Sequence, residues 1–237
     1  MRATIAHLSA NHAPPLSAVG PSATVRLSRA SDWVSYPLVK LAAGKYSSVL
    51  RTPEHFLRML LLIEDKRFLV HPGVDPLSVI RALTFNARGG LIQGASTVTQ
   101  QLYNIRRRNV WAARRGWTYK FKQSLWALSS SVVSRKSDLL NEYVDTVYWG
   151  RSYYGLDQAA EGYFGATRGS LNAAQSFLLA ERIAAPNAVC PRRILNLMER
   201  GSVRNSLELG QATIFEVAAL YQRVYGRGGS LWAIRAR

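Results

Sequence analysis

The chain has 237 residues, 48% of them hydrophobic, and carries 31 Lys and Arg against 14 Asp and Glu, for a formal charge of +17. This length and composition allow one sizeable folded core, built as one or two lobes, and exclude a largely disordered chain. The excess of cations indicates a polyanionic partner: nucleic acid, an anionic membrane face or a phosphorylated substrate. Cys190 is the only cysteine, which excludes an internal disulfide, a cysteine metal cluster and a redox pair.

The N-terminal part of the chain gives weak structural signals. Residues 1–47 are rich in Ala, Ser and Pro and show no sustained helical or strand period. We expect a poorly ordered or loosely packed N-terminal segment there. The opening residues lack the apolar centre of a secretory signal, and no run of about 18 apolar residues predicts a membrane-spanning helix.

The first strong helix signal is Thr52-Pro53-Glu54, which supplies an N-cap, a proline at the first helical position and an acid in the first turn. We expect this helix to carry Glu64 near its C-terminal end and to stop at Pro72-Gly73.

Glu64 is a carboxylate where a structural helix would carry a leucine. Its neighbours on the same helical side are Leu57, Leu60 and Leu61. Asp65 falls on the outer side, near Arg58. Because loss of water disfavours the charged form, an apolar setting raises the pKa of Glu64 and makes it a candidate general base. The alternative is a helix-end glutamate that turns to solvent or pairs with Arg67.

Further helices are predicted along the rest of the chain. Asp75-Pro76 begins one, and residues 88–90 break it. Two later helices have apolar positions that we expect to form core: Phe121, Leu125, Leu128 and Val132, then Leu139, Tyr143 and Val147. Residues 150–155 are predicted to form a turn, followed by helices at 159–164, 171–183 and 214–225. Strand signals are scarce, so the sequence predicts a mainly α fold.

Residues 94–101, GASTVTQQ, place a glycine and short hydroxyls just ahead of two glutamines. This composition is suited to holding phosphate or sugar oxygens at a helix N-terminus. The alternative is a Ser/Thr capping sequence with exposed glutamines.

Residues 104–122 contain seven basic residues and no acid, with two tryptophans among them. Cations among aromatic rings suit single-stranded nucleic acid, an anionic bilayer or a pyrophosphate. A solvated basic loop is the alternative, against which the tryptophans weigh.

Two motifs in this order resemble the glycosyltransferase family 51 domain, which polymerises lipid II: residues 64–73, EDKRFLVHPG, and residues 94–101. Further matches extend the resemblance over residues 48–191, the expected domain, and leave residues 192–237 as a helical C-terminal extension with a basic tail. No Ser-x-x-Lys or Lys-Thr-Gly set is present, which indicates the monofunctional type. The resemblance implies a mainly α fold with a lysozyme-like large lobe and a smaller membrane-facing lobe.

The resemblance also implies roles for individual residues. Glu64 would be the base that deprotonates the acceptor hydroxyl during inverting attack on a polyprenyl-pyrophosphate-linked glycan. The implied substrate-binding residues are Asp65, Phe68, His71, Ser96, Thr97, Gln100, Gln101, Arg106, Arg115, Lys120 and Gln123. No residue is assigned as a metal ligand, although Mg²⁺ or Mn²⁺ is an implied cofactor.

The resemblance further implies partners and a location. The partners are lipid II, the growing glycan strand, an anionic membrane surface and other cell-wall synthesis proteins. The implied location is peripheral, on the periplasmic or outer face of the plasma membrane.

Three positions of the implied leaving-group site depart from the family pattern. Asn104 stands in place of a lysine, Tyr119 in place of an arginine, and Gln123 in place of a second glutamate, while Arg106 is near enough in sequence to replace the lysine. One alternative that stays open is therefore a weakened or inactive member that binds glycan or lipid-linked precursor. Another, supported by the net charge and the aromatic residues, is nucleic-acid binding through residues 104–122, although the chain has no recognised nucleic-acid motif.

Overall fold

The computed structural model describes residues 23–87, 96–107 and 116–226. Within these ranges the helices are α1 (Ala23–Ser47), α2 (Glu54–Glu64), α3 (Pro76–Ala87), α4 (Val98–Arg106), α5 (Trp117–Val133), α6 (Lys136–Thr146), α7 (Leu156–Phe164), α8 (Ala173–Arg182), α9 (Pro191–Met198), α10 (Gly201–Leu209) and α11 (Ile214–Tyr225). A short 3-10 helix spans Arg168–Ser170, and strands β1 (Tyr148–Gly150) and β2 (Tyr153–Tyr154) form an antiparallel hairpin at the predicted turn. The predicted mainly α fold is confirmed.

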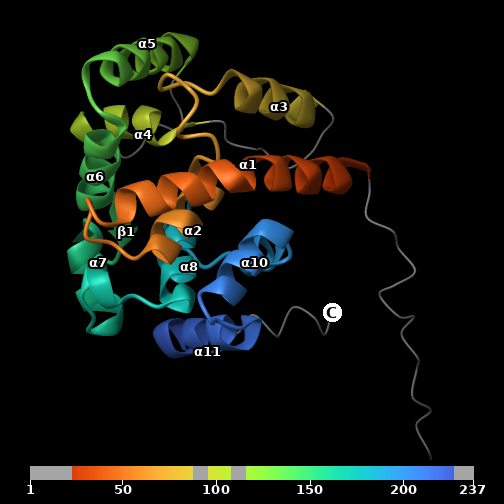
Figure 1. Cartoon of the computed structure of the whole chain (residues 1–237), viewed down its shortest axis with the longest axis vertical. Helices are drawn as coiled ribbons and strands as arrows, with labels where there is room; N and C mark the ends of the chain where they lie inside the picture. Colours follow the sequence, from red (N-terminus) through yellow and green to blue (C-terminus); the bar gives the residue numbers. More distant parts are fainter. Residues whose placement is uncertain (1–22, 88–95, 108–115, 227–237) are drawn as a thin grey trace, which may run out of the picture.

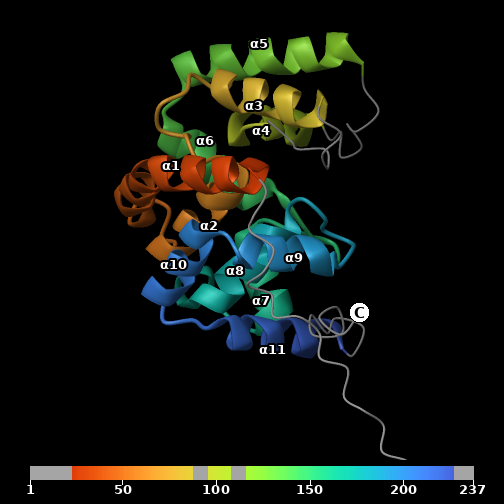
Figure 2. The ribbon, with the colours of Figure 1, turned by 90° about the vertical axis from the view of Figure 1, so that its right-hand side faces the viewer.

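Helix α2 is the centre of the packing. Helices α3, α4 and α5 gather at one end of the molecule and α7, α8 and α11 at the other, with α1 and α2 between them (Figure 1, Figure 2). All residues of α2 from 56 to 62 are buried, against α1, α8 and α10. Full burial of each leucine contributes about 1.5–3 kcal/mol, so α2 holds its last residue, Glu64, on a strongly stabilised element.

Helix α1 corrects the expectation of a loosely packed segment up to residue 47. One side of it is buried in the core through Tyr36, Val39, Ala42, Ala43 and Tyr46. The sequence pattern hid this helix because Pro37 lies inside it and because small alanines form much of the buried side. Residues 1–22 of the expected segment lie outside the described residues.

The bounds of α2 also differ from the prediction. Thr52 donates its hydroxyl hydrogen to the Leu50 carbonyl and does not cap the helix, which begins after Pro53. The helix ends at Glu64 rather than at Pro72-Gly73, and a loop follows. In that loop Gly73 has φ +91°, and a Cβ there would lie 2.1 Å from the Ala127 carbonyl oxygen of α5. Only glycine fits this position, so the loop lies directly against α5.

Helices α9 and α10 belong to the main core, which corrects the expected extension from residue 192. Their buried apolar residues are Ile194, Leu197, Met198, Val203 and Leu207. The buried Arg58 of α2 donates from Nε to the Ser206 hydroxyl of α10 at 3.1 Å. Helix α11 packs on α8 and confirms the helix predicted over residues 214–225.

Helix α5 has an exposed apolar face where the sequence predicted core. Phe121, Leu125 and Val132 are 64%, 50% and 83% exposed. Leu128 and Val133 are also exposed, and so are Leu77 and Ile80 of α3 at the same end of the molecule (Figure 2). None of the described helices is both long enough and apolar enough to span a bilayer.

Candidate active site

Glu64 lies at the C-terminal end of α2 and is half-buried. Gln101 of α4 donates from Nε2 to Glu64 Oε2 at 2.8 Å. Burial raises the pKa of the Glu64 carboxyl, while the hydrogen bond from Gln101 and the charge of Arg193 act in the opposite direction. The alternative pairing with Arg67 is wrong, because Arg67 donates two hydrogen bonds from Nη2 to Asp75, at 2.9 and 2.8 Å.

Tyr143 is a site residue that the sequence reading placed only in the core. Its hydroxyl donates to Gln101 Oε1 at 2.7 Å. Burial raises the pKa of Tyr143 well above its ordinary value, and the nearby charges of Glu64 and Asp65 raise it further. Because the tyrosine hydroxyl therefore keeps its proton, the amide oxygen of Gln101 faces Tyr143 and the amide nitrogen faces Glu64. The carboxylate is held by a chain of two hydrogen bonds from α6 through α4.

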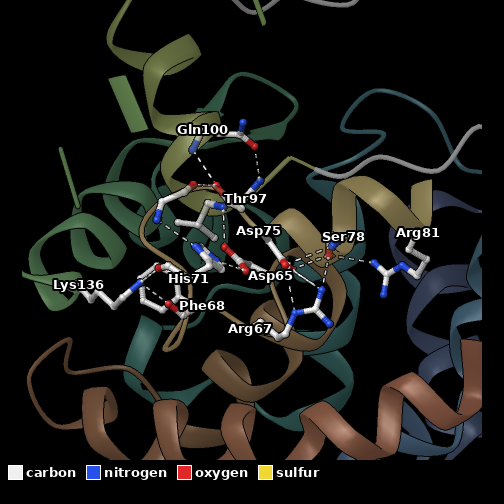
Figure 3. A network of polar contacts seen from close by, with 12 residues as sticks. Asp65, Arg67, Phe68, His71, Asp75, Ser78, Arg81, Thr97, Gln100 and Lys136 are labelled. Atoms are coloured by element: carbon white, nitrogen blue, oxygen red, sulfur yellow. Dashed lines mark hydrogen bonds and ion pairs between the residues drawn. The ribbon is translucent and has the colours of Figure 1, made fainter. Parts of the chain in front are cut away.

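Asp65 is buried, not on the outer side near Arg58. Its Oδ1 accepts from His71 Nε2 at 2.8 Å, and its Oδ2 accepts from the Val98 backbone nitrogen at 3.0 Å (Figure 3). His71 Nδ1 accepts from the Gly73 backbone nitrogen at 3.1 Å, which assigns the ring proton to Nε2. Asp65 and His71 therefore join the end of α2 to the start of α4. Both side chains make these hydrogen bonds within the chain itself.

The loop after Glu64 is also held from α6. Lys136 Nζ donates to the carbonyl oxygens of Phe68 and His71, the latter at 2.7 Å, and lies 4.7 Å from the centre of the Phe68 ring (Figure 3). Phe68 is only 1% exposed and packs edge to face on Tyr46. Phe68 is thus a core residue that shapes the loop, rather than a residue facing an open site.

Thr97 and Gln100 form the capping box at the start of α4. Thr97 Oγ1 accepts from the Gln100 backbone nitrogen, and Gln100 Oε1 accepts from the Thr97 backbone nitrogen, both at 3.1 Å (Figure 3). Thr97 also donates to the Gly73 carbonyl, and Gln100 donates to Ser124 Oγ at 3.0 Å. Both residues are buried. Thr97 therefore caps the helix, as the alternative interpretation of residues 94–101 expected. That interpretation also expected exposed glutamines, whereas Gln100 is buried.

A second polar group joins α4 to α5. Lys120 Nζ donates to Ser96 Oγ at 2.8 Å and to Gln123 Oε1 at 2.7 Å. Gln123 is buried and donates from Nε2 to the Gln100 carbonyl and to Asn104 Oδ1. Tyr119 also donates to Asn104 Oδ1, at 2.6 Å. The three positions that depart from the family pattern are thus hydrogen-bonded to one another.

Arg106 is not brought to this group. It makes a two-pronged ion pair with Glu142 of α6, Nε to Oε1 and Nη2 to Oε2 at 2.6 Å each, and lies over the Trp126 ring. The hydrogen bonds that Arg106 donates to Glu142 raise the pKa of Arg106. The expected replacement of a pyrophosphate-binding lysine by Arg106 is not supported by this geometry. Arg115 and the other positions from 108 to 115 lie outside the described residues.

A pocket of about 630 Å³ is lined by one residue of each polar group, Gln101 and Asn104, and by Ile105 of the same helix, α4. Its other lining residues are Thr146, Val147, Tyr148, Tyr154, Ile183, Ala184 and Pro186. The Tyr148 and Tyr154 rings pack 4.9 Å apart. Aromatic walls with a few amide and hydroxyl groups, at this volume, suit a ligand of one or two sugar rings.

Comparison with known proteins identifies a family. A family described as Transglycosylase matches residues 39–211. The chain is 34% identical over 153 residues to penicillin-binding protein 1A of Aquifex aeolicus, covering 64% of this chain and 20% of that protein. It is 33% identical over 147 residues to a Cupriavidus necator protein named as a transglycosylase, covering 62% of each.

The chain belongs to the transglycosylase family, and the resemblance drawn from residues 64–73 and 94–101 is confirmed. It spans about a fifth of the length of the penicillin-binding relatives that it matches. The matched region begins inside α1 and ends after α10, in agreement with the core that these helices share.

Proposed function

We propose that the chain is a peptidoglycan glycosyltransferase that polymerises lipid II, with Glu64 as the general base. The observation that carries this proposal is the setting of Glu64: a carboxylate with a raised pKa, held by Gln101, whose side chain also lines a pocket of sugar size. A base with a pKa moved toward neutrality takes a proton most effectively near physiological pH.

The chemistry needs one proton transfer and one displacement. Glu64 takes the proton of the acceptor sugar hydroxyl as its oxygen attacks the anomeric carbon of the donor. The bond from that carbon to the polyprenyl pyrophosphate breaks, the pyrophosphate leaves with the electron pair, and the anomeric configuration inverts. Lys120 is a residue of α5 and donates to Ser96, just before α4, and to Gln123. At that place its positive charge stabilises the negative charge that develops on the departing pyrophosphate.

The exposed apolar residues support a peripheral membrane position, at the periplasmic or outer face where lipid-linked glycan is used. The five exposed apolar residues of α5 and the two of α3 lie at the same end of the molecule. Exposed apolar side chains at one end of the molecule, together with a charge of +17, suit the interface of an anionic bilayer. This end of the molecule is our proposed membrane-facing lobe.

The test is Glu64→Gln, which keeps the side-chain size and its acceptor oxygen for Gln101 but removes the base. We expect lipid II polymerisation by the purified chain to fall by about a hundredfold or more. Glu161→Gln, an exposed position on α7, is the matched control and should leave the rate unchanged. Equal rates for the native chain and Glu64→Gln would overturn the assignment.

A second candidate function is binding of glycan or lipid-linked precursor without turnover. It is favoured by the neutral side chains Asn104, Tyr119 and Gln123. The tyrosine and the glutamine both donate hydrogen bonds to Asn104 Oδ1. It predicts saturable lipid II binding with no polymer at any divalent-ion concentration, and activity gained by the double change Tyr119→Arg with Gln123→Glu. Polymerisation by the native chain would exclude this candidate.

A further inference from the structure

The polar group between α4 and α5, which we call the amide cluster, consists of Asn104, Tyr119, Lys120 and Gln123. Its hydrogen bonds fix the direction of the Gln123 amide. Nε2 donates one hydrogen to the Gln100 carbonyl at 2.7 Å and the other to Asn104 Oδ1 at 3.1 Å. A reversed amide would set oxygen against both acceptors and NH₂ against the Lys120 ammonium, so only Oε1 can face Lys120.

Asn104 and Tyr119 complete this arrangement. Asn104 Oδ1 accepts from both the Tyr119 hydroxyl, at 2.6 Å, and Gln123 Nε2. The hydrogen bond from Tyr119 holds Asn104 Oδ1 in place as the acceptor for Gln123 Nε2. With its nitrogen held there, the Gln123 amide points Oε1 toward Lys120. Asn104 and Tyr119 therefore act on Lys120 through Gln123 rather than by contact with it.

The partners of Lys120 leave its charge uncompensated. Its ammonium donates to Ser96 Oγ and Gln123 Oε1, both neutral, and makes no ion pair with a carboxylate among the described residues. Burial lowers the pKa of Lys120, and an anion bound at the third ammonium hydrogen would oppose that effect.

The oxygens of this cluster do not fit a divalent cation. Mg²⁺ and Mn²⁺ favour charged carboxylate and phosphate oxygens, whereas the oxygens here belong to two amides, two hydroxyls and a backbone carbonyl. Gln123 Oε1 and Asn104 Oδ1 already accept hydrogen bonds. The charged group beside them is the Lys120 ammonium, which repels a cation.

We infer that the amide cluster holds no divalent cation at Gln123, so that Lys120 meets the diphosphate without a metal, and that Asn104 and Tyr119 are positioning residues for Lys120. This inference rests on the proposed function for the identity of the diphosphate carrier. It concerns binding, and it can be tested without turnover.

The experiment measures inorganic pyrophosphate binding to the full chain by calorimetry, once in EDTA and once in excess MgCl₂. In the native chain we expect binding in EDTA. Lys120→Met should weaken it by about tenfold or more, while Lys122→Met, a neighbouring exposed cation on α5, should change it by less than about twofold. Lack of binding in EDTA, or an equal loss in both lysine variants, would overturn the inference.

Two further variants test the positioning residues. Tyr119→Phe removes only the hydroxyl and should weaken binding in EDTA by about threefold to tenfold. Gln123→Glu sets a carboxylate oxygen against the Gln100 carbonyl and neutralises Lys120, so it should lose binding in EDTA and regain it in MgCl₂. A Tyr119→Phe chain that binds like the native one would contradict the positioning role. A Gln123→Glu chain with no response to Mg²⁺ would contradict the claim that the neutral amide is what keeps a cation out. Circular dichroism of each variant identifies loss of fold.

Lipid II turnover measured on the same samples separates this inference from the proposed function. Metal-free pyrophosphate binding without any polymer would refute the polymerase and leave the inference standing. Polymerisation with pyrophosphate binding that depends on Mg²⁺ would refute the inference alone.

Discussion

The Tyr143 hydroxyl lies 2.7 Å from Gln101 Oε1, and Gln101 in turn donates to Glu64. A glutamine amide can bind either way round, and the Glu64 carboxylate, which only accepts hydrogen bonds, turns the amide nitrogen toward itself. The amide oxygen then faces Tyr143, whose raised pKa keeps the hydroxyl protonated and able to donate. Tyr143 therefore holds the hydrogen-bond partner of Glu64 from a different helix, without touching Glu64 itself.

Tyr143→Phe should lower kcat/KM for lipid II polymerisation by about tenfold, or about 1.4 kcal/mol in transition-state free energy, because Gln101 is then free to rotate. The ring stays in the core, so the melting temperature should change little. Tyr148→Phe, which loses a hydrogen bond to Asn187 at another tyrosine of the pocket, is the comparison. A larger loss in Tyr148→Phe than in Tyr143→Phe would argue against the relay.

Arg193 should control the pH dependence of the reaction. Its charge lowers the pKa of Glu64 against the effect of burial, and the buried Glu181 holds it at 3.4 Å. Arg193→Gln therefore raises the Glu64 pKa further, and the acid limb of the kcat profile should move to higher pH. Glu181→Gln removes a negative charge that raises the same pKa. We expect the opposite movement there, and movement of both profiles in one direction would contradict this electrostatic account.

Glu64→Gln should stabilise the fold at neutral pH. Because the folded-state pKa is raised, protonation of Glu64 favours folding at low pH, and this stability is lost as pH rises through the folded-state pKa. Glutamine resembles the protonated carboxyl at every pH. Urea unfolding should thus give Glu64→Gln a higher free energy of unfolding at pH 7.5, with the difference vanishing below about pH 4. A variant less stable than the native chain at pH 7.5 would show that Glu64 is not desolvated.

The apolar face of α5 should bind bilayers. Phe121→Ser with Leu125→Ser should weaken binding to anionic liposomes by about a hundredfold, since each large apolar side chain contributes about 1.5–3 kcal/mol when buried. Leu209→Ser, an exposed leucine on α10, is the control. Liposome flotation compared with single-stranded DNA binding at one ionic strength also decides the nucleic-acid alternative. Tighter binding to DNA by the native chain would favour that alternative over the membrane.

The sequence was most informative where a residue contradicted its local pattern. Glu64 stood out because a carboxylate occupied an apolar helical position. The raised pKa that the sequence predicted agrees with the burial of its carboxyl group in the structure. Tyr143 did not stand out, because a tyrosine at core spacing gives no sign that its hydroxyl meets an amide 42 residues away. The pairing of Arg106 with Glu142 was hidden for the same reason.

Periodicity also failed to say what an apolar face rests on. The spacing of Phe121, Leu125 and Leu128 correctly placed them on one side of a helix, but the same spacing arises when that side is covered by protein or left open. Helix α1 shows the converse error. Its buried alanines give little periodic contrast, yet tertiary packing against α2 determines the helix.

The contact of Gly73 with Ala127 has a consequence for where the reaction takes place. Because no side chain separates the loop from α5, and because Asp65 and His71 tie that same loop to the end of α2, the loop connects Glu64 directly to the helix that carries the exposed apolar face. The height of Glu64 above any surface on which α5 rests is then set by these contacts. A lipid-linked sugar of one length would meet the carboxylate, and a shorter or longer linkage between lipid and sugar would present its reacting atoms at the wrong height.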